Sequence, residues 1–342
     1  MNSTIINVVS GKGGTGKTLL SCVLADMLGN SADSRTVVVD LDFFVRGLTS
    51  LLYFHQEEKL QITSGKSITV SDFFVAKRAS PVQELAILKY RSFDVVPAVS
   101  RIDEQLNFED IGPNTKFEAR SILKALIDSL SAKYRFIILD SRAGFDELVA
   151  AAHELSTASI CVEEQDPISR VTSDNLISQL ANGSRVPVFR LVNKARGIRR
   201  QEDITFEARS IFDLGLIPFD MDILNNFGLP TFWDTVNRSL YRWALARSWN
   251  IFSSKLQLSA ELVLPRISPV VNEALEQRVG MLAMRERILF IYGIVLAVVG
   301  ILYGVLGRDI LFAFRDDPVR FVSLCAGLVG IAMTIYAFFR RR

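Results

Sequence analysis

The sequence has few cysteines, few histidines and little net charge, and each shortage excludes a class of protein. Its three cysteines, Cys22, Cys161 and Cys325, lie far apart and form no C-x-x-C pair, so neither a disulfide framework nor a zinc site is predicted. The two histidines, His55 and His153, have no metal-ligand spacing. A formal net charge of +2 does not mark a nucleic-acid-binding protein. We therefore expect the cysteines to be small buried residues in a reducing compartment.

The sequence also lacks the pattern of a secretory signal peptide, because it enters an apolar strand almost at once. We therefore expect the first domain to lie in the cytoplasm. Charged side chains are also absent from two long segments near the end of the sequence. Residues 288–306 and 321–339 are two runs of 19 residues without a charged side chain. At 1.5 Å per residue, each run would span about 28 Å, close to the hydrocarbon thickness of a bilayer, so we expect a transmembrane hairpin.

The arginines around these two runs predict an orientation. Three lie between the runs and six flank them, an excess that favours a cytoplasmic location for both termini. We therefore expect a multi-pass protein of the inner membrane, with lipid among its partners. The flanking arginines are Arg278, Arg285, Arg287, Arg340, Arg341 and Arg342, and those between the runs are Arg308, Arg315 and Arg320.

What the sequence does contain is a glycine-rich phosphate-binding segment near its start. Residues 11–18 read G-K-G-G-T-G-K-T and fit the pattern G-x-x-x-x-G-K-[ST], between an apolar strand and an apolar helix. Glycines allow the backbone to approach a phosphate and surround it with N–H groups. The nucleotide-binding backbone is expected at Gly11, Lys12, Gly13, Gly14, Thr15 and Gly16.

The last two residues of this segment have side-chain roles. Lys17 supplies a positive charge to the β- and γ-phosphates, and the Thr18 hydroxyl is placed to bind Mg²⁺. The helix that begins near Lys17 directs its free N–H groups at the same anion. ATP and Mg²⁺ are therefore the expected cofactors.

Three aspartates follow apolar strands. Asp40 and Asp42 follow the run TVVVDL, and Asp140 closes the run YRFIILD. Carboxyl ends of parallel strands meet at the ligand-binding edge of the sheet. Of the first two, one can hold a magnesium-bound water and the other can orient the attacking water. Asp140 has the Walker B position, whose carboxylate holds a magnesium water.

Alternating strand and helix patterns predict an α/β fold, a doubly wound and mostly parallel sheet, followed by a helical segment and two transmembrane helices. We expect a P-loop ATPase domain in residues 1–225, a helical extension and linker in 226–284, and the hairpin in 285–342. Strands are expected at 36–41, 93–97, 134–140, 159–163 and 187–193, and helices at 19–28, 48–60, 70–76, 115–132 and 271–287.

The first lysine of the glycine-rich segment, Lys12, makes the segment similar to that of a known family. The string K-G-G-x-G-K-T, with Lys12 first, resembles the deviant Walker A P-loop of the MinD/ParA family of ATPases. The resemblance implies that Lys12 reaches across a homodimer, formed through the nucleotide face, to the partner's nucleotide. It also implies that the D-x-D pair is part of switch I, with Asp42 the hydrolytic residue and Asp40 on the magnesium side.

Further segments match the same family in order. Residues 140–144, D-S-R-A-G, resemble its D-[ST]-P-A-G switch II, which implies that Gly144 offers its N–H to the γ-phosphate. Arg142 stands where the family usually has proline, and we expect it to be solvated, or else to contact phosphate or a partner. Asn193 corresponds to an adenine-contacting asparagine. Pro218 lies in residues 214–220, which resemble the loop that closes over the base.

The catalytic residues implied are Lys12, Lys17 and Asp42, acting in the reaction of ATP with water to ADP and phosphate. The metal is expected at Thr18, Asp40 and Asp140. A basic run at Arg196, Arg199 and Arg200 is followed by acidic residues and has no aromatic residues beside it. We therefore expect no nucleic-acid partner.

Three functions fit these features. The first is a membrane-anchored, MinD/ParA-like switch whose ATP-bound dimer recruits or regulates a partner protein. The second is a membrane effector whose ATP-dependent assembly disrupts or gates the membrane. The third is a bacterial tyrosine-kinase-like enzyme, which the absence of a C-terminal tyrosine cluster disfavours, since the chain ends in FFRRR.

Overall fold

The computed structural model describes residues 3–31, 35–63, 68–75, 85–101, 115–196, 211–263 and 292. The chain divides into two compact units. One consists of Met1–Arg196 with Gln201–Pro265, and the other of Gly197–Arg200 with Arg266–Arg342. All helices and strands named below lie in the first unit.

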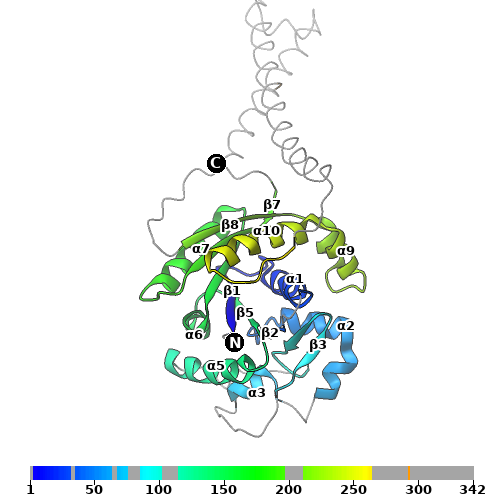
Figure 1. Ribbon diagram of the computed structural model, residues 1–342, viewed down its shortest axis with the longest axis vertical. Coiled ribbons are helices and arrows are strands. Elements are labelled where there is room, and N and C mark those ends of the chain that lie inside the picture. The colour runs from blue at the N-terminus through cyan, green and yellow to red at the C-terminus, as the bar shows by residue number, and fades with distance from the viewer. Residues whose placement is uncertain are drawn as a thin grey trace, which may run out of the picture. The chain divides into compact units, whose positions relative to one another are not determined.

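An eight-stranded sheet forms the centre of the described part of the first unit (Figure 1), in the order β3-β4-β2-β5-β1-β6-β7-β8. All neighbouring strands are parallel except β3, which runs antiparallel to β4. β1 lies where the winding reverses, since β2 and β4 are on one side of it and β6 to β8 on the other. Such a reversal is where open α/β sheets bind ligands. The strands are β1 (Thr4–Ser10), β2 (Thr36–Asp40), β3 (Leu88–Tyr90), β4 (Phe93–Val96), β5 (Phe136–Ala143), β6 (Ala158–Glu164), β7 (Val188–Ala195) and β8 (Ile211–Pro218).

Helices cover both faces of the sheet, as parallel strands require because each crossover must pass over a face. In Figure 1, α1 and α10 lie on one face, and α5, α6 and α7 lie on the other. The described helices are α1 (Lys17–Gly29), α2 (Gly47–Thr63), α3 (Val70–Val75), α5 (Lys116–Ser131), α6 (Glu147–Leu155), α7 (Pro167–Ala181), α8 (Met221–Asn226), α9 (Phe232–Arg238) and α10 (Leu240–Lys255).

The valine run of β2 shows how the sequence specifies two buried faces. Successive side chains of a strand point to opposite sides. Val38 packs in the cluster formed with α1, α2, α9 and α10, whereas Val37 and Val39 pack in the cluster formed with α3, α5 and α6. Since both faces are covered, an unbroken apolar run is needed rather than alternation.

The aromatic segment near residue 250 belongs to this packing. The Trp249 ring meets Phe136 at a centroid distance of 5.7 Å, and Phe252 meets Phe189 at 4.6 Å. The two partners lie on strands β5 and β7 of the sheet. Residues 232–255 of the predicted helical extension therefore form part of the layer that covers the sheet.

The predicted α/β fold with a doubly wound, mostly parallel sheet is confirmed. The strands expected at 36–41, 93–97, 134–140, 159–163 and 187–193 correspond to β2, β4, β5, β6 and β7, and four of the expected helices to α1, α2, α3 and α5.

Two strands differ from the prediction. β3 was not expected, and residues 214–218, interpreted as a loop over the base, complete strand β8. The reason is pairing with a neighbour, since β8 extends the sheet alongside β7.

The predicted multi-pass localisation in the inner membrane is wrong on the described residues, where no helix combines the length and the apolar character needed to cross a bilayer. The two runs expected to form the hairpin, 288–306 and 321–339, lie outside the described residues apart from Tyr292, as does the helix expected at 271–287. The transmembrane part of the predicted fold is therefore not supported.

Candidate nucleotide-binding site

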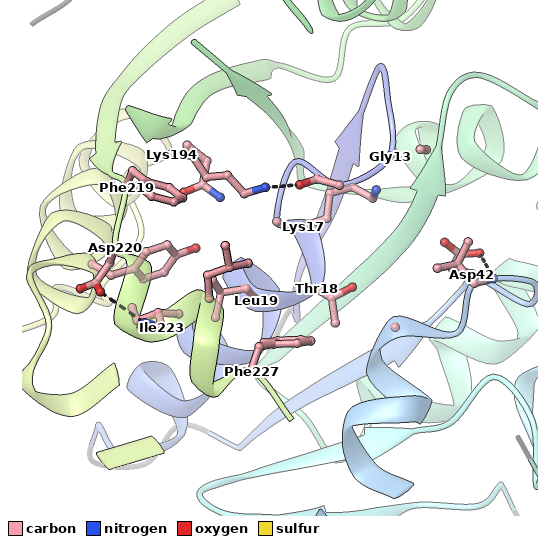
Figure 2. A pocket seen from close by; sticks show the side chains of 18 of the residues that line it. Gly13, Lys17, Thr18, Leu19, Asp42, Lys194, Phe219, Asp220, Ile223 and Phe227 are labelled. Carbon is pink, nitrogen blue, oxygen red and sulfur yellow. Dashed lines mark hydrogen bonds between the residues drawn. The ribbon is translucent and has the colours of Figure 1, made fainter. Parts of the chain in front are cut away.

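A pocket of about 430 Å³ opens beside the glycine-rich loop, at the carboxyl ends of the central strands (Figure 2). One part of its wall is the loop and the start of α1. The other part is apolar and comes from α8, α10 and the end of β8. Residues that line it include Gly13, Gly14, Gly16, Lys17, Thr18, Leu19, Asp42, Phe44, Val45, Arg142, Asn193, Lys194, Pro218, Phe219, Ile223, Leu224, Phe227 and Tyr241.

Two glycines of the loop are required by the surrounding structure. Gly16 has a φ of 91°, and a Cβ there would lie 2.4 Å from Nδ2 of Asn193. At Gly11, a Cβ would lie 2.3 Å from the backbone carbon of Thr172 in α7. Any larger residue would push apart the loop and the elements that hold it.

The loop and the first turn of α1 fit an anion. The N-cap of α1, Gly16, makes no side-chain capping hydrogen bond, so the first N–H groups of the helix are available to a ligand. A Cβ on Gly13 or Gly14 would meet nothing within 4 Å, so the loop is open on that side. These features fit the phosphates of a nucleotide.

Lys17 is nearly buried beneath this loop, and its Nζ lies 3.0 Å from Oγ of Ser10. Burial lowers the pKa of Lys17, and the nearby carboxylates of Asp140 and Asp42 oppose that effect. A bound phosphate would add further negative charge beside this buried ammonium group and favour its charged form.

Asp140 joins the end of β5 to α1. Its carboxylate accepts hydrogen bonds from the hydroxyls of Thr18 at 2.7 Å and Ser21 at 3.1 Å. Burial raises the pKa of Asp140 to about 6, although Lys17 and these two hydroxyls oppose it. A metal ion would favour the charged form of this carboxylate.

Asp40 is fully buried and is held by protein donors. Oδ2 accepts hydrogen bonds from the backbone N–H of Thr49 at 2.9 Å and from its hydroxyl at 2.7 Å. Oδ1 accepts a hydrogen bond from the N–H of Asp42 at 3.1 Å. Burial, and then the charge of Asp140, raise the pKa of Asp40 to about 7. Asp40 thus fixes the segment between β2 and α2.

Asp42 lines the pocket. Its Oδ1 accepts a hydrogen bond from the N–H of Val45 at 3.0 Å, and its backbone carbonyl accepts a hydrogen bond from the N–H of Arg46 at 2.9 Å. These bonds hold Asp42 in a turn after β2, and Figure 2 shows it on the side of the pocket that lies away from Lys194 and Phe219.

The oxygen atoms at this edge fit magnesium. Thr18, Asp40 and Asp140 offer a hydroxyl and two carboxylates, and Mg²⁺ prefers oxygen ligands. Among the described residues, no group of three or more His, Cys, Asp and Glu could hold a metal by itself.

Lys12 lies against its own subunit. Its Nζ is 2.8 Å from Oδ2 of Asp166 and 3.0 Å from Oε2 of Glu164. Hydrogen bonds to Asp166 and Glu164 raise the pKa of Lys12. The predicted contact with a partner's nucleotide would require both ion pairs to break.

Gly144 is engaged within the chain. Its φ is 86°, and its N–H donates to the carbonyl of Ser10 at 2.9 Å. The β1–β5 register, which places Ser10 opposite Ala143, brings these two groups together. The N–H predicted to meet the γ-phosphate is therefore free only after this bond opens.

Asn193 and Pro218 both line the pocket. The Asn193 side chain is fully buried, and Nδ2 donates to the carbonyl of Thr15 at 2.8 Å. Asn193 thus supports the phosphate loop, while Leu19, Ile223 and Phe227 form the apolar wall around the remaining space.

Arg142 connects the two predicted switch segments. Its guanidinium lies 3.1 Å from Oδ2 of Asp146 and 5.6 Å from the centre of the Phe44 ring. It is therefore a contacting residue rather than a purely solvated one. In the basic run, the guanidinium of Arg196 lies over the Phe219 ring, 5.1 Å from its centre. Arg199 and Arg200 lie outside the described residues.

Several lining residues were not predicted from the sequence, and two of them are polar side chains close to the loop or the apolar wall. Tyr241 reaches the pocket from α10, and Lys194 reaches it from β7. The sequence did carry one signal, because Lys194 directly follows Asn193. No pattern in the sequence relates Tyr241 to the loop.

Comparison with known proteins shows similar sequences. Residues 3–170 match the family described as AAA domain. A ParA family protein of Mycoplasma genitalium, MG470, is 27% identical over 167 residues, which cover 48% of this chain and 60% of the relative. The chain thus spans about three fifths of the length of the first curated relatives that it matches. The septum site-determining protein MinD of Escherichia coli is 24% identical over 249 residues, covering 67% of this chain and 84% of the relative.

Solved structures give the same fold. MinD of Pyrococcus horikoshii, in complex with Mg-ADP, aligns with a TM-score of 0.52 at 21% identity, covering 74% of this chain and 97% of that one. The chain therefore has the α/β P-loop fold of the MinD and ParA proteins and is similar to these P-loop ATPases.

Proposed function

We propose that this chain is an ATPase of the MinD/ParA kind that binds MgATP, pairs with a second copy through the nucleotide, and uses the paired state as a switch. The observation that carries the proposal is that one pocket collects Lys17, Thr18 and Asp42, with Asp140 hydrogen-bonded to Thr18 directly behind it.

In this proposal, the start of α1 and the ammonium group of Lys17 bind the β- and γ-phosphates. Mg²⁺, held by Thr18 and through waters by Asp140 and Asp40, would neutralise charge that develops on the phosphate oxygens. Asp42, which lines the pocket, orients the attacking water. The products are ADP and phosphate.

The base has a separate place in the pocket. Beyond the loop, the wall formed by Leu19, Ile223 and Phe227 is apolar, and apolar walls with few polar groups are typical of cofactor sites. Pro218 and Asn193 border this part of the pocket. We propose that adenine lies there.

Pairing through the nucleotide would take Lys12 from its own carboxylates to the phosphates of the second copy. Exposed apolar side chains lie in the two segments that contact the loop region, next to Gly144 and in α7. Phe145 is 46% exposed, Ile168 is 70% exposed and Val171 is 59% exposed. Such residues are suited to contact a second copy or a partner protein whose binding follows pairing.

ATP turnover tests the proposal. Purified full-length chain should release phosphate from ATP in a magnesium-dependent manner, and Lys17→Ala and Asp42→Ala variants should lose that activity. Lys17→Ala should also lose nucleotide binding, whereas Asp42→Ala should keep it. Circular dichroism of each variant checks that the fold is retained. Wild-type chain that neither binds nor hydrolyses ATP would refute the proposal.

A further inference from the structure

One carboxylate at the edge of the pocket is shared by two lysines. This carboxylate belongs to Glu164, the last residue of β6. Its Oε1 lies 2.7 Å from Nζ of Lys194, and its Oε2 lies 3.0 Å from Nζ of Lys12. Although burial acts to raise it, hydrogen bonds from Lys194 and Lys12 hold the pKa of Glu164 below its ordinary value. Glu164 is therefore a charged link between the P-loop and β7.

The backbone at Lys194 is arranged to make this contact. Its φ is 54°, a left-handed conformation that residues other than glycine rarely adopt. The β6–β7 register places the preceding residue, Asn193, opposite Glu164. Figure 2 shows the Lys194 side chain extending to the loop, where Nζ donates to the carbonyl of Gly14 at 2.5 Å.

Sharing weakens the hold of Glu164 on each lysine. The positive charge of Lys194 partly neutralises the carboxylate that also attracts Lys12, and the two ammonium groups repel each other. The side chains of Lys12, Lys194 and Glu164 are 30%, 31% and 23% exposed. Partly exposed pairs of this kind are individually weak, so small changes in charge can shift the balance between them.

We propose that Lys194 is a positioning residue that competes with Lys12 for Glu164 and so sets how readily Lys12 leaves its own subunit for the nucleotide of a second copy. This inference rests on the proposed nucleotide-dependent pairing. Without the charge of Lys194, Glu164 pairs with Lys12 alone, and the Lys12–Glu164 ion pair becomes stronger. Removing the charge of Glu164 releases Lys12 to Asp166 only.

The first test is nucleotide-dependent pairing of the full chain with Mg²⁺ and a non-hydrolysable ATP analogue. Lys194→Met should raise the dimer dissociation constant by about fivefold, since two weak ion pairs per dimer become harder to break. Glu164→Gln should lower it. Lys124→Met is the matched control, because it removes an exposed lysine that pairs with Asp128 on α5; it should pair as wild type does.

A double variant separates competition from direct support of the loop. If Lys194 acts through Glu164, Lys194→Met should have no effect in the Glu164→Gln background. If Lys194 acts only by holding the carbonyl of Gly14, its loss should weaken pairing equally in both backgrounds and weaken ADP binding by the single chain as well. That second result would overturn the inference.

A readout without pairing keeps this inference distinct from the proposed function. In nucleotide-free chain, the rate of amine acylation at Lys12, followed by mass spectrometry, reports how firmly its ammonium group is held. Lys194→Met should slow acylation and Glu164→Gln should speed it. Wild-type chain that binds ATP without pairing would contradict the proposed function but leave this assay valid. Equal acylation rates in all variants would overturn the competition itself.

Discussion

The hydroxyl of Thr18 donates a 2.7 Å hydrogen bond to the carboxylate of Asp140, which joins the first turn of α1 to β5. Two of the three residues expected at the metal are therefore linked before a metal binds. Asp140→Asn keeps an acceptor for Thr18 but removes the charge. We expect Mg²⁺-dependent ATP hydrolysis to fall by about 100-fold or more, since charge stabilisation at the phosphates is the main catalytic term.

A magnesium titration of phosphate release measures this effect. Asp128→Asn, on the exposed surface of α5, is the matched control and should behave as wild type does. Full activity of Asp140→Asn at the wild-type magnesium concentration would show that Asp140 does not serve the metal.

Burial of Asp40 and Asp140 makes stability depend on pH. The pKa of these groups is raised to about 7 and about 6 in the folded chain, above the value near 4 in unfolded chains. The folded state therefore binds more protons between about pH 4 and 7, and the free energy of unfolding should decrease as pH rises through that range. Urea titrations in magnesium-free buffer at several pH values between 5 and 8 measure it.

The pH effect has an internal check. Asp40→Asn removes one titrating group, so its unfolding free energy should decline less with pH than that of the wild type. Parallel curves for the two proteins would mean that Asp40 does not take up a proton on folding in this range.

The glycines of the loop predict graded effects. Gly16→Ala combines a φ of 91° with a contact of 2.4 Å to Asn193, and should abolish nucleotide binding and lower the melting temperature. Gly183→Ala, with a φ of 76° but open space around it, isolates the backbone cost of about 1–2 kcal/mol. Thermal melting and nucleotide titration compare the two. Equal effects would rule out crowding by Asn193 as the cause.

The aromatic layer of α10 predicts that this helix is part of the nucleotide-binding fold. Trp249 is buried against Phe136 of β5, so Trp249→Ala should cost about 3–5 kcal/mol of unfolding free energy. Trp243→Ala is the matched control, since Trp243 is only partly buried and packs at the edge of the cluster. Urea unfolding distinguishes them, and a loss below about 1 kcal/mol for Trp249→Ala would place α10 outside the cooperative core.

The parts of the site that the sequence revealed are those specified by local chemistry. Glycines, Lys17 and Thr18 lie in one contiguous segment whose order dictates their roles, and Asp40 and Asp140 end apolar strands that must be buried. The sheet then brings those strand ends together. For the same reason, β2 and β5 were predictable from their apolar runs.

The parts that the sequence did not reveal depend on long-range pairing. Nothing near Gly144 shows that its N–H bonds to Ser10, because that contact follows from the register of β1 and β5. The sharing of Glu164 by Lys12 and Lys194 likewise joins residues from three separate segments. β3, only three residues long and held by pairing with β4, has too little pattern of its own to predict.

The proposed function requires that a nucleotide joins two copies of this chain with the help of Lys12. Its most direct test is the molar mass of the full chain in solution, measured by sedimentation with Mg²⁺ and either no nucleotide, ADP or a non-hydrolysable ATP analogue. We predict twice the monomer mass with the ATP analogue alone, and monomer under all three conditions for Lys12→Ala. An unchanged mass for wild-type chain that has bound the ATP analogue would contradict the account.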